Sequence, residues 1–390
     1  MRLFFVSLIL LVISCTGNST KDEIHPIKER YPYQNESVEE VTISRKLDDT
    51  SEQLIIPGKS ILEKRAFASV MDITEIDSVI EPEANLYMAQ FESIAKDRVV
   101  FLDTFQNLLY EYNLSTQKWT VLAEQGRGPS ELLFAKDVSV IESDLYVTSG
   151  DSRISQFDCS NTPCVFKKEI SLKGINPTSV AITNDELIVM GNLSKYSFSG
   201  SVSDSVIINS LFEVDRAGTV LNKYGHFYDV QKHWMLLQPF SSGKIRYSNE
   251  VDYHLMQYFD LIPYLYLFED GTLTKKFHFS GFNVAKRRFV PTTQELFGSF
   301  EDWSLIQDVT KVADNILMVT IRHYGNRRVT DLGLKWDESK DFYLINISEN
   351  KSHYLGQSFV ESENIWVTNK HLIKQKDGKL FFNTYKIKLK

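Results

Sequence analysis

The sequence predicts an all-β fold, a six-bladed β-propeller with seven blades as the alternative, placed after a signal peptide and a short tether. Short apolar runs alternate with turn residues through most of the 390 residues, which is typical of strands. The best helical period, Leu54 to Val70, is broken by Pro57-Gly58. Aromatic residues, which favour strands, make up 12% of the chain. A local phrase also recurs at intervals typical of propeller blades.

The first fifteen residues have the layout of an export signal. Arg2 precedes an apolar run from Leu3 to Ile13, which is far shorter than the ~20 residues that span a bilayer. The run ends in Val12-Ile13-Ser14-Cys15, which resembles the lipobox of bacterial lipoproteins. This resemblance implies a lipid on Cys15 and attachment to a membrane; the alternative is an ordinary cleaved signal with a chance cysteine. Thr16 in place of aspartate is typical of outer-membrane sorting, so we expect a cell-envelope protein at the outer membrane, on its periplasmic or surface face.

The chain divides into three expected segments. Residues 1–14 are the lipoprotein signal peptide, residues 15–40 a lipidated flexible tether rich in charged and polar residues, and residues 41–390 the propeller domain. The formal net charge is −8, and the longest basic block is Lys286-Arg287-Arg288. A nucleic-acid partner would need a larger basic surface, so we expect none.

The repeated phrase is a polar turn residue followed by three or four apolar residues and a second polar residue. Its copies begin at Asp97, Asp144, Asp185, Glu250, Asp314 and Asn364. Six copies predict six blades of four short strands. Because too few residues follow Asn364 for four strands, we expect the segment from about Lys64 to Ile76 to complete the last blade and close the ring. The two long intervals leave room for a seventh blade, and a pair of β-sandwiches with coincidental spacing is the other alternative.

Cysteine and histidine usage limits the chemistry. Cys159 and Cys164 enclose the turn-forming residues Asn161 to Pro163, so outside the cytoplasm we expect a local disulfide, with two buried thiols as the alternative. The eight histidines are dispersed without metal-ligand spacing, so we expect no metal and no cofactor. Sequence signatures of serine hydrolases, zinc proteases and phosphate-binding loops are missing, so no catalytic residue is assigned.

The phrase Gly126-Arg127-Gly128-Pro129-Ser130-Glu131 follows one expected strand and precedes the next repeat. It resembles the Gly-x-Gly-Pro-x-Glu phrase of six-bladed, TolB-like propeller lipoproteins of Gram-negative gut bacteria, from which Ser130 departs where a glycine is usual. The stretches 264–271 and 275–281 are similar to the family's middle-blade pattern. This resemblance covers about residues 65 to 390 and implies fold and location, not activity. The phrase is interpreted as an inter-blade turn or, alternatively, as a site where Arg127 and Glu131 contact an anionic or polyol ligand at the mouth of the central channel.

Three polar and aromatic loops are further candidates for ligand contact, because tryptophan and tyrosine stack on sugars while charged side chains bond hydroxyls. The alternative is that the aromatic residues pack between blades. We expect a ligand- or partner-binding module for a glycan, a peptide or another envelope protein, with a carbohydrate or lactone hydrolase or lyase as the alternative. The segments contain Trp234, followed by Lys244, Arg246 and Tyr247; then Arg322, His323 and Tyr324; and finally Trp336.

Overall fold

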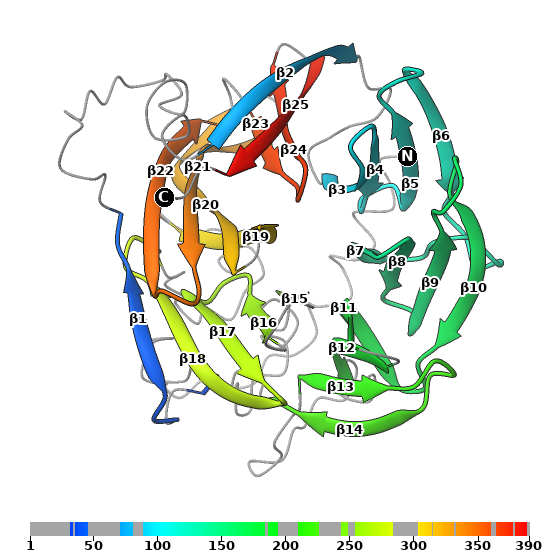
Figure 1. The fold of residues 1–390 in the computed structure, drawn as a ribbon, viewed down its shortest axis with the longest axis horizontal. Coiled ribbons are helices and arrows are strands. Elements are labelled where there is room, and N and C mark those ends of the chain that lie inside the picture. The colour runs from blue at the N-terminus through cyan, green and yellow to red at the C-terminus, as the bar shows by residue number, and fades with distance from the viewer. Residues whose placement is uncertain are drawn as a thin grey trace.

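The computed structural model describes residues 32–33, 36–45, 71–80, 89–183, 186–193, 210–225, 243–248, 254–283, 303–313, 315–330, 333–359, 364–376 and 379–387. In this part of the chain six small sheets form a closed ring, and no helix occurs (Figure 1). The predicted all-β, six-bladed propeller is therefore confirmed, and the seven-blade alternative is wrong. No helix long and apolar enough to cross a bilayer is found among the described residues.

Each blade has four antiparallel strands that follow one another from the centre to the rim (Figure 1). Blades 1 and 2 contain β3 (Ala89–Ala95), β4 (Arg98–Asp103), β5 (Leu108–Asn113), β6 (Lys118–Ala123), β7 (Ala135–Ile141), β8 (Asp144–Ser149), β9 (Arg153–Asp158) and β10 (Val165–Ser171). Blades 3 and 4 contain β11 (Ile175–Thr183), β12 (Glu186–Leu193), β13 (Leu211–Val214), β14 (Val220–Tyr224), β15 (Gly243–Ser248), β16 (His254–Phe259), β17 (Tyr264–Glu269) and β18 (Thr272–Phe279). Blades 5 and 6 contain β19 (Trp303–Ala313), β20 (Ile316–Thr330), β21 (Gly333–Asn346), β22 (Lys351–Phe359), β23 (Asn364–Val367), β24 (His371–Lys376), β25 (Lys379–Ile387) and β2 (Met71–Ile80).

The repeated phrase marks the second strand of the first five blades. All six residues of β4 are buried, as are five of the six in β8. These strands lie between neighbouring strands and have a blade on either side, so both faces are apolar and the run is continuous. The sixth copy, at Asn364, is β23, which is the innermost strand of the last blade; the equivalent second strand is β24. The blade count was therefore predicted correctly although the last copy lies one strand out of frame.

The ring closes through a strand from the other end of the domain. β2 pairs antiparallel with β25, from Met71↔Ile387 to Ile80↔Leu380, and forms the rim of blade 6 (Figure 1). The predicted closing segment, 64–76, overlaps this strand at residues 71–76, and its residues 64–70 lie outside the described part of the chain. Because β2 is followed directly by blade 1, closure joins the first and last blades and covers an otherwise open sheet edge.

Part of the predicted tether is packed on the propeller. Residues 32–33 and 36–45, called here the N-terminal strap, include β1 (Glu39–Ile43), which adds to the rim of blade 4 as a fifth strand parallel to β18. Tyr33 is 5% exposed and its hydroxyl donates to Gln257 Oε1 at 2.8 Å. At the other end of the strap, Arg45 pairs with the buried Asp341 of blade 5 at 3.0 Å. Ordered contacts with the propeller thus begin before residue 41.

Candidate functional site

Charged side chains from four blades meet at the centre of the ring. The innermost strands contribute Glu92 from β3, Asp137 from β7, Lys244 and Arg246 from β15, and Asp308 from β19. Asp260, in the turn between β16 and β17, interacts electrostatically with Lys244, Asp137 and Asp308. These six residues are called the axial cluster. Since innermost strands surround the propeller axis (Figure 1), residues far apart in the sequence become neighbours here.

Asp137 anchors the cluster. Its side chain is 1% exposed and forms ion pairs with Lys244 Nζ at 3.1 Å and Arg246 Nη1 at 3.0 Å. The Ser179 hydroxyl, on β11, donates to Asp137 Oδ2 at 2.5 Å. Burial by itself would raise the pKa of Asp137, but the two cations and these hydrogen bonds outweigh it and hold the pKa below its ordinary value. Asp137 is therefore ionised and forms ion pairs with both cations.

Arg246 bridges the centre of the ring. Its guanidinium lies 3.3 Å from Asp308 Oδ1 in blade 5 and 3.7 Å from Glu92 Oε1 in blade 1. The Tyr258 hydroxyl also donates to Asp308 Oδ1, at 3.4 Å. The side chains of Glu92 and Asp308 are 14% and 26% exposed, against 13% for Arg246. The carboxyl groups of Glu92 and Asp308 therefore face solvent at least as much as the cations do.

Two carboxyl groups of the cluster hold protons near neutral pH. Burial raises the pKa of Glu92 to about 8, and Asp308 and Asp137 add to this effect while Arg246 opposes it. Burial likewise raises the pKa of Asp260 to about 7. Carboxyl groups of this kind can donate hydrogen bonds at neutral pH and can ionise when a positive charge arrives.

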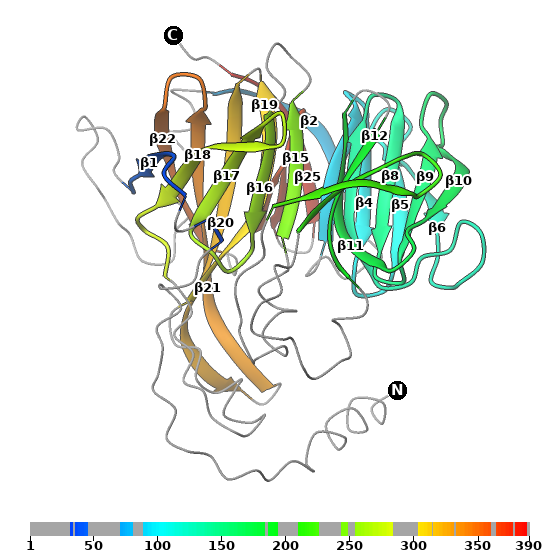
Figure 2. The same ribbon diagram turned by 90° about the horizontal axis from the view of Figure 1, so that it is seen from below.

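The cluster lies toward one face of the ring. Gly243, at the start of β15, pairs with Phe259, so the turn that holds Asp260 lies beside the start of an innermost strand. Lys244 and Asp137 are the second and third residues of their strands. The face at which the innermost strands begin is called the start face. Trp303, at the start of β19, pairs with Tyr324 of β20. The β20–β21 hairpin continues beyond this pair and therefore extends past the ring at the start face (Figure 2).

The cluster has the chemistry of a site for a polar or cationic ligand. The cluster presents carboxyl oxygens to a ligand, and its own two cations, Lys244 and Arg246, are already paired with Asp137. The position is partly buried, so electrostatic interactions there are stronger than in bulk water. Among the described residues, no group of three or more His, Cys, Asp or Glu side chains is placed to hold a metal ion.

The predicted residues Arg127 and Glu131 lie in the connection from β6 to β7. Both are exposed, and Glu131 Oε2 accepts the Gly128 amide at 2.5 Å. The Arg127 carbonyl accepts a hydrogen bond from Arg153 Nη1 at 3.4 Å. These contacts fix an inter-blade turn at the start face, and binding of an anion or polyol there stays a prediction.

Arg322, His323 and Tyr324 lie in a strand rather than in the loop that the sequence predicted. All three belong to β20, where Arg322 is 7% exposed and donates through Nε to Glu338 Oε2 at 2.8 Å. The ring of Tyr324 stacks on Trp303 with centroids 4.1 Å apart. The loop assignment was wrong because blade 5 has unusually long central strands, so polar residues near its turn remain paired in the sheet.

His323 lies between a serine and an aspartate. Its Nδ1 is 2.7 Å from Ser304 Oγ and its Nε2 is 3.0 Å from Asp341 Oδ2. These are the groups of a hydrolase triad. However, Ser304 is completely buried and its oxygen also accepts the Asn283 amide at 2.9 Å. The arrangement therefore joins strands within blade 5 and does not present a nucleophile.

The remaining predicted residues divide by whether the structure describes them. Tyr247 and Trp336 fall in β15 and β21, but the structure does not describe their side chains, and Trp234 lies outside the described residues.

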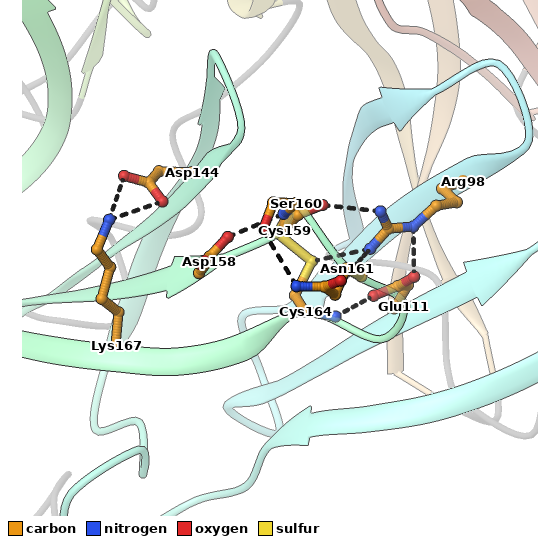
Figure 3. Close-up of a disulfide and its surroundings, with 9 residues drawn as sticks. All are labelled: Arg98, Glu111, Asp144, Asp158, Cys159, Ser160, Asn161, Cys164 and Lys167. Atoms are coloured by element: carbon orange, nitrogen blue, oxygen red, sulfur yellow. Dashed lines mark hydrogen bonds and ion pairs between the residues drawn. A yellow bond between two sulfur atoms is a disulfide. The ribbon is translucent and has the colours of Figure 1, made fainter.

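The predicted disulfide is present: Cys159 and Cys164 are joined by an S–S bond of 2.07 Å. Figure 3 shows that the loop between them is held by Arg98 of blade 1, which donates to the carbonyl oxygens of Cys159 and Asn161 at 2.8 and 2.7 Å.

Sequence reasoning included Lys244 and Arg246 in a candidate segment but missed the carboxyl members of the axial cluster. Each innermost-strand member lies four to seven residues before a copy of the repeated phrase: Arg246 before Glu250, Glu92 before Asp97, Asp308 before Asp314 and Asp137 before Asp144. This common position is the signal that could have found them. Asp260 lies in the turn after β16 instead, so its position relative to the repeated phrase differs from that of the other members.

The ring and its centre define a six-bladed β-propeller with a charged axial site. Solved structures with a similar fold include a Bacteroides fragilis NCTC 9343 protein that carries the provisional description of an exported protein, at 10% identity and a TM-score of 0.52, covering 90% of this chain and 100% of that one. The WD40 propeller domain of Doa1 is 11% identical, with a TM-score of 0.41 and coverage of 80% and 97%. The similarity shows the fold alone. No family model and no curated protein matches the sequence.

Proposed function

We propose that the protein is a lipid-anchored binding module of the cell envelope, related to the TolB-like propeller lipoproteins, that takes its ligand at the axial cluster from the start face. The lipobox at Val12 to Cys15 supports the anchor. The description of the similar Bacteroides fragilis protein as exported is in line with this location. Cys15 would carry the lipid, and the strap would hold the propeller close to the membrane.

The anchor is tested by its cysteine. Cys15→Ala is expected to abolish incorporation of labelled fatty acid and to move the protein from the membrane fraction to the soluble fraction. Cys159→Ala is the matched control, since it removes a cysteine outside the lipobox and should leave the labelling intact. Equal labelling of the Cys15→Ala variant and the natural protein would show that the lipobox assignment is wrong.

The observation that carries the binding role is the surplus of accessible carboxyl groups in the axial cluster. Four carboxyl groups surround two cations, and Asp137, the most buried, already takes both. Glu92 and Asp308 also contact Arg246, at 3.7 and 3.3 Å, but their side chains are 14% and 26% exposed, so they and the half-buried Asp260 can still face a ligand. Carboxylates accept hydrogen bonds from hydroxyl and ammonium groups, and charge-assisted bonds are the stronger of these. The expected ligand is therefore polar and carries a positive charge or several hydroxyl groups.

A screen of the mature, detergent-solubilised protein against glycans, amines and peptides tests this role. Glu92→Gln and Asp308→Asn are expected to weaken binding of a ligand found in the screen at least tenfold, which is roughly one charge-assisted hydrogen bond. Glu124→Gln, an exposed carboxyl on the β6–β7 connection, is the matched control. Unchanged affinity in both axial variants would place the ligand elsewhere.

The pKa values near neutrality favour a second candidate, a hydrolase or lyase for carbohydrates or lactones. Glu92 with a pKa of about 8 and Asp260 with a pKa of about 7 have the ionisation required of a general acid and a general base. Turnover that falls at least a hundredfold in Glu92→Gln would favour the enzyme. Ligand binding without turnover would favour the binding module.

A further inference from the structure

Two phenylalanine side chains project into solvent at the start face. Phe105 is 72% exposed and Phe134 is 61% exposed, the two highest values among the large hydrophobic residues that the structure describes. Phe105 lies in the β4–β5 turn, beside the start of β3, and Phe134 immediately precedes β7. Apolar side chains grouped at one place on a soluble surface mark a site of interaction, whereas isolated ones need no explanation.

The two turns that carry these rings are joined and rigid. Asn107 Oδ1, in the first turn, accepts the Ala135 amide at 2.7 Å, directly beside Phe134. Asp103 Oδ1 accepts the amides of Phe105 and Gln106, both at 2.9 Å. The rings are therefore presented by fixed backbone, which lowers the entropy lost when a partner binds.

Phe134 has an unfavourable backbone conformation. Its φ angle is 54°, in the left-handed region that a bulky side chain rarely adopts. The carbonyl of Phe134 accepts the Gly150 amide at 2.9 Å, and this bond from blade 2 holds the conformation. A residue better suited to this region, such as asparagine, would serve the fold equally well, so folding alone does not require a phenylalanine at this position.

The exposed rings are close to the axial cluster. Phe134 precedes Asp137 by three residues along one chain, which limits the distance between their Cα atoms to ~10 Å. The Ser139 hydroxyl, two residues further along β7, is 6% exposed and has no hydrogen-bond partner in the described part of the chain. One face thus combines an apolar patch with a polar site whose carboxyl groups outnumber its cations.

We propose that the start face binds an extended peptide segment of a protein partner, with a lysine or arginine side chain in the axial cluster and an apolar side chain against Phe105 and Phe134. This inference rests on the proposed function for the location of the ligand site. The partly exposed carboxyl groups of Glu92 and Asp308 favour a peptide over a lipid surface, because their oxygens can accept hydrogen bonds from a basic side chain but not from an anionic phosphate. An extended chain advances ~3.3 Å per residue, so a separation of at most ~10 Å corresponds to a basic and an apolar residue no more than three positions apart.

Fluorescence anisotropy of labelled, end-capped hexapeptides against the mature protein tests the inference. Peptides that place arginine two or three positions from leucine are expected to bind at least tenfold more tightly than peptides with glutamine for the arginine or alanine for the leucine. Phe105→Ser combined with Phe134→Asn should remove this preference for leucine. Val165→Ser, which changes a side chain that is 60% exposed on rim strand β10, is the matched control and should have no effect.

The outcomes separate this inference from the proposed function. Binding of a ligand that depends on Glu92 but not on either phenylalanine would overturn the peptide site and leave the axial site standing. Peptide binding that depends on the phenylalanines but not on Glu92 would overturn the two-part recognition. Association with phosphatidylglycerol vesicles that disappears in the double phenylalanine variant, without any peptide binding, would assign the face to a membrane and overturn the inference.

Discussion

Replacing Asp137 with alanine is expected to lower the free energy of unfolding by about 3 to 5 kcal/mol, because it leaves two buried cations without their main counter-charge. Lys244 and Arg246 lie 3.1 and 3.0 Å from this carboxylate, and each side chain is only 13% exposed. Asp308 is their remaining acidic partner within 3.8 Å, apart from the mostly protonated Glu92. Urea or guanidinium denaturation with the linear extrapolation measures the effect.

Two variants control for the simple loss of a side chain. Ser179→Ala removes one neutral partner of Asp137 and should cost about 1 kcal/mol. Lys244→Met in the Asp137→Ala background should restore part of the lost stability, since it removes one of the uncompensated charges. A change below about 1 kcal/mol in Asp137→Ala would contradict the view that this aspartate holds the centre of the ring together.

The fold could be predicted because blade geometry leaves a mark on the sequence. Second strands such as β4 are buried on both faces, and this produces one copy of the repeated phrase in each blade. The same rule explains the one misplaced copy: β23 is also largely buried, so Asn364 begins a similar phrase one strand early. The strap was not predicted, because its contacts come from Tyr33, the residues of β1 and Arg45, and these residues form no periodic pattern.

The axial cluster could be predicted only in part because ring closure, not sequence proximity, assembles it. Glu92 and Asp308 are 3.7 and 3.3 Å from the same guanidinium although more than two hundred residues separate them. The segment chosen for Arg322, His323 and Tyr324 does not contribute to the axial cluster. Arg322 and His323 are paired within blade 5, where Glu338 and Asp341 satisfy them.

Stability should fall between about pH 4.5 and pH 8 through Glu92, and Glu92→Gln should remove this part of the pH dependence. The pKa of this carboxyl is raised from 4.5 to about 8 by burial. An acid whose folded-state pKa is raised binds its proton more tightly in the folded state. Its contribution is therefore fully present below its unfolded-state pKa and is lost as the pH rises through the folded-state value. Over this interval the expected loss is about 3 to 5 kcal/mol.

The comparison is made between the natural protein and Glu92→Gln by denaturation at pH 5 and pH 9. At pH 5 the two should be nearly equal in stability, because both carry a neutral side chain of similar shape. At pH 9 the variant should be the more stable by about 3 to 5 kcal/mol, since only the natural protein then has an ionised Glu92 beside Asp308 and Asp137. Glu124→Gln, at an exposed position, should leave the pH dependence unchanged. Equal stability at pH 9 would mean that Arg246 compensates the ionised carboxylate in full, and Glu92 would then be an ion-pair partner of that arginine with no proton to exchange when a ligand binds.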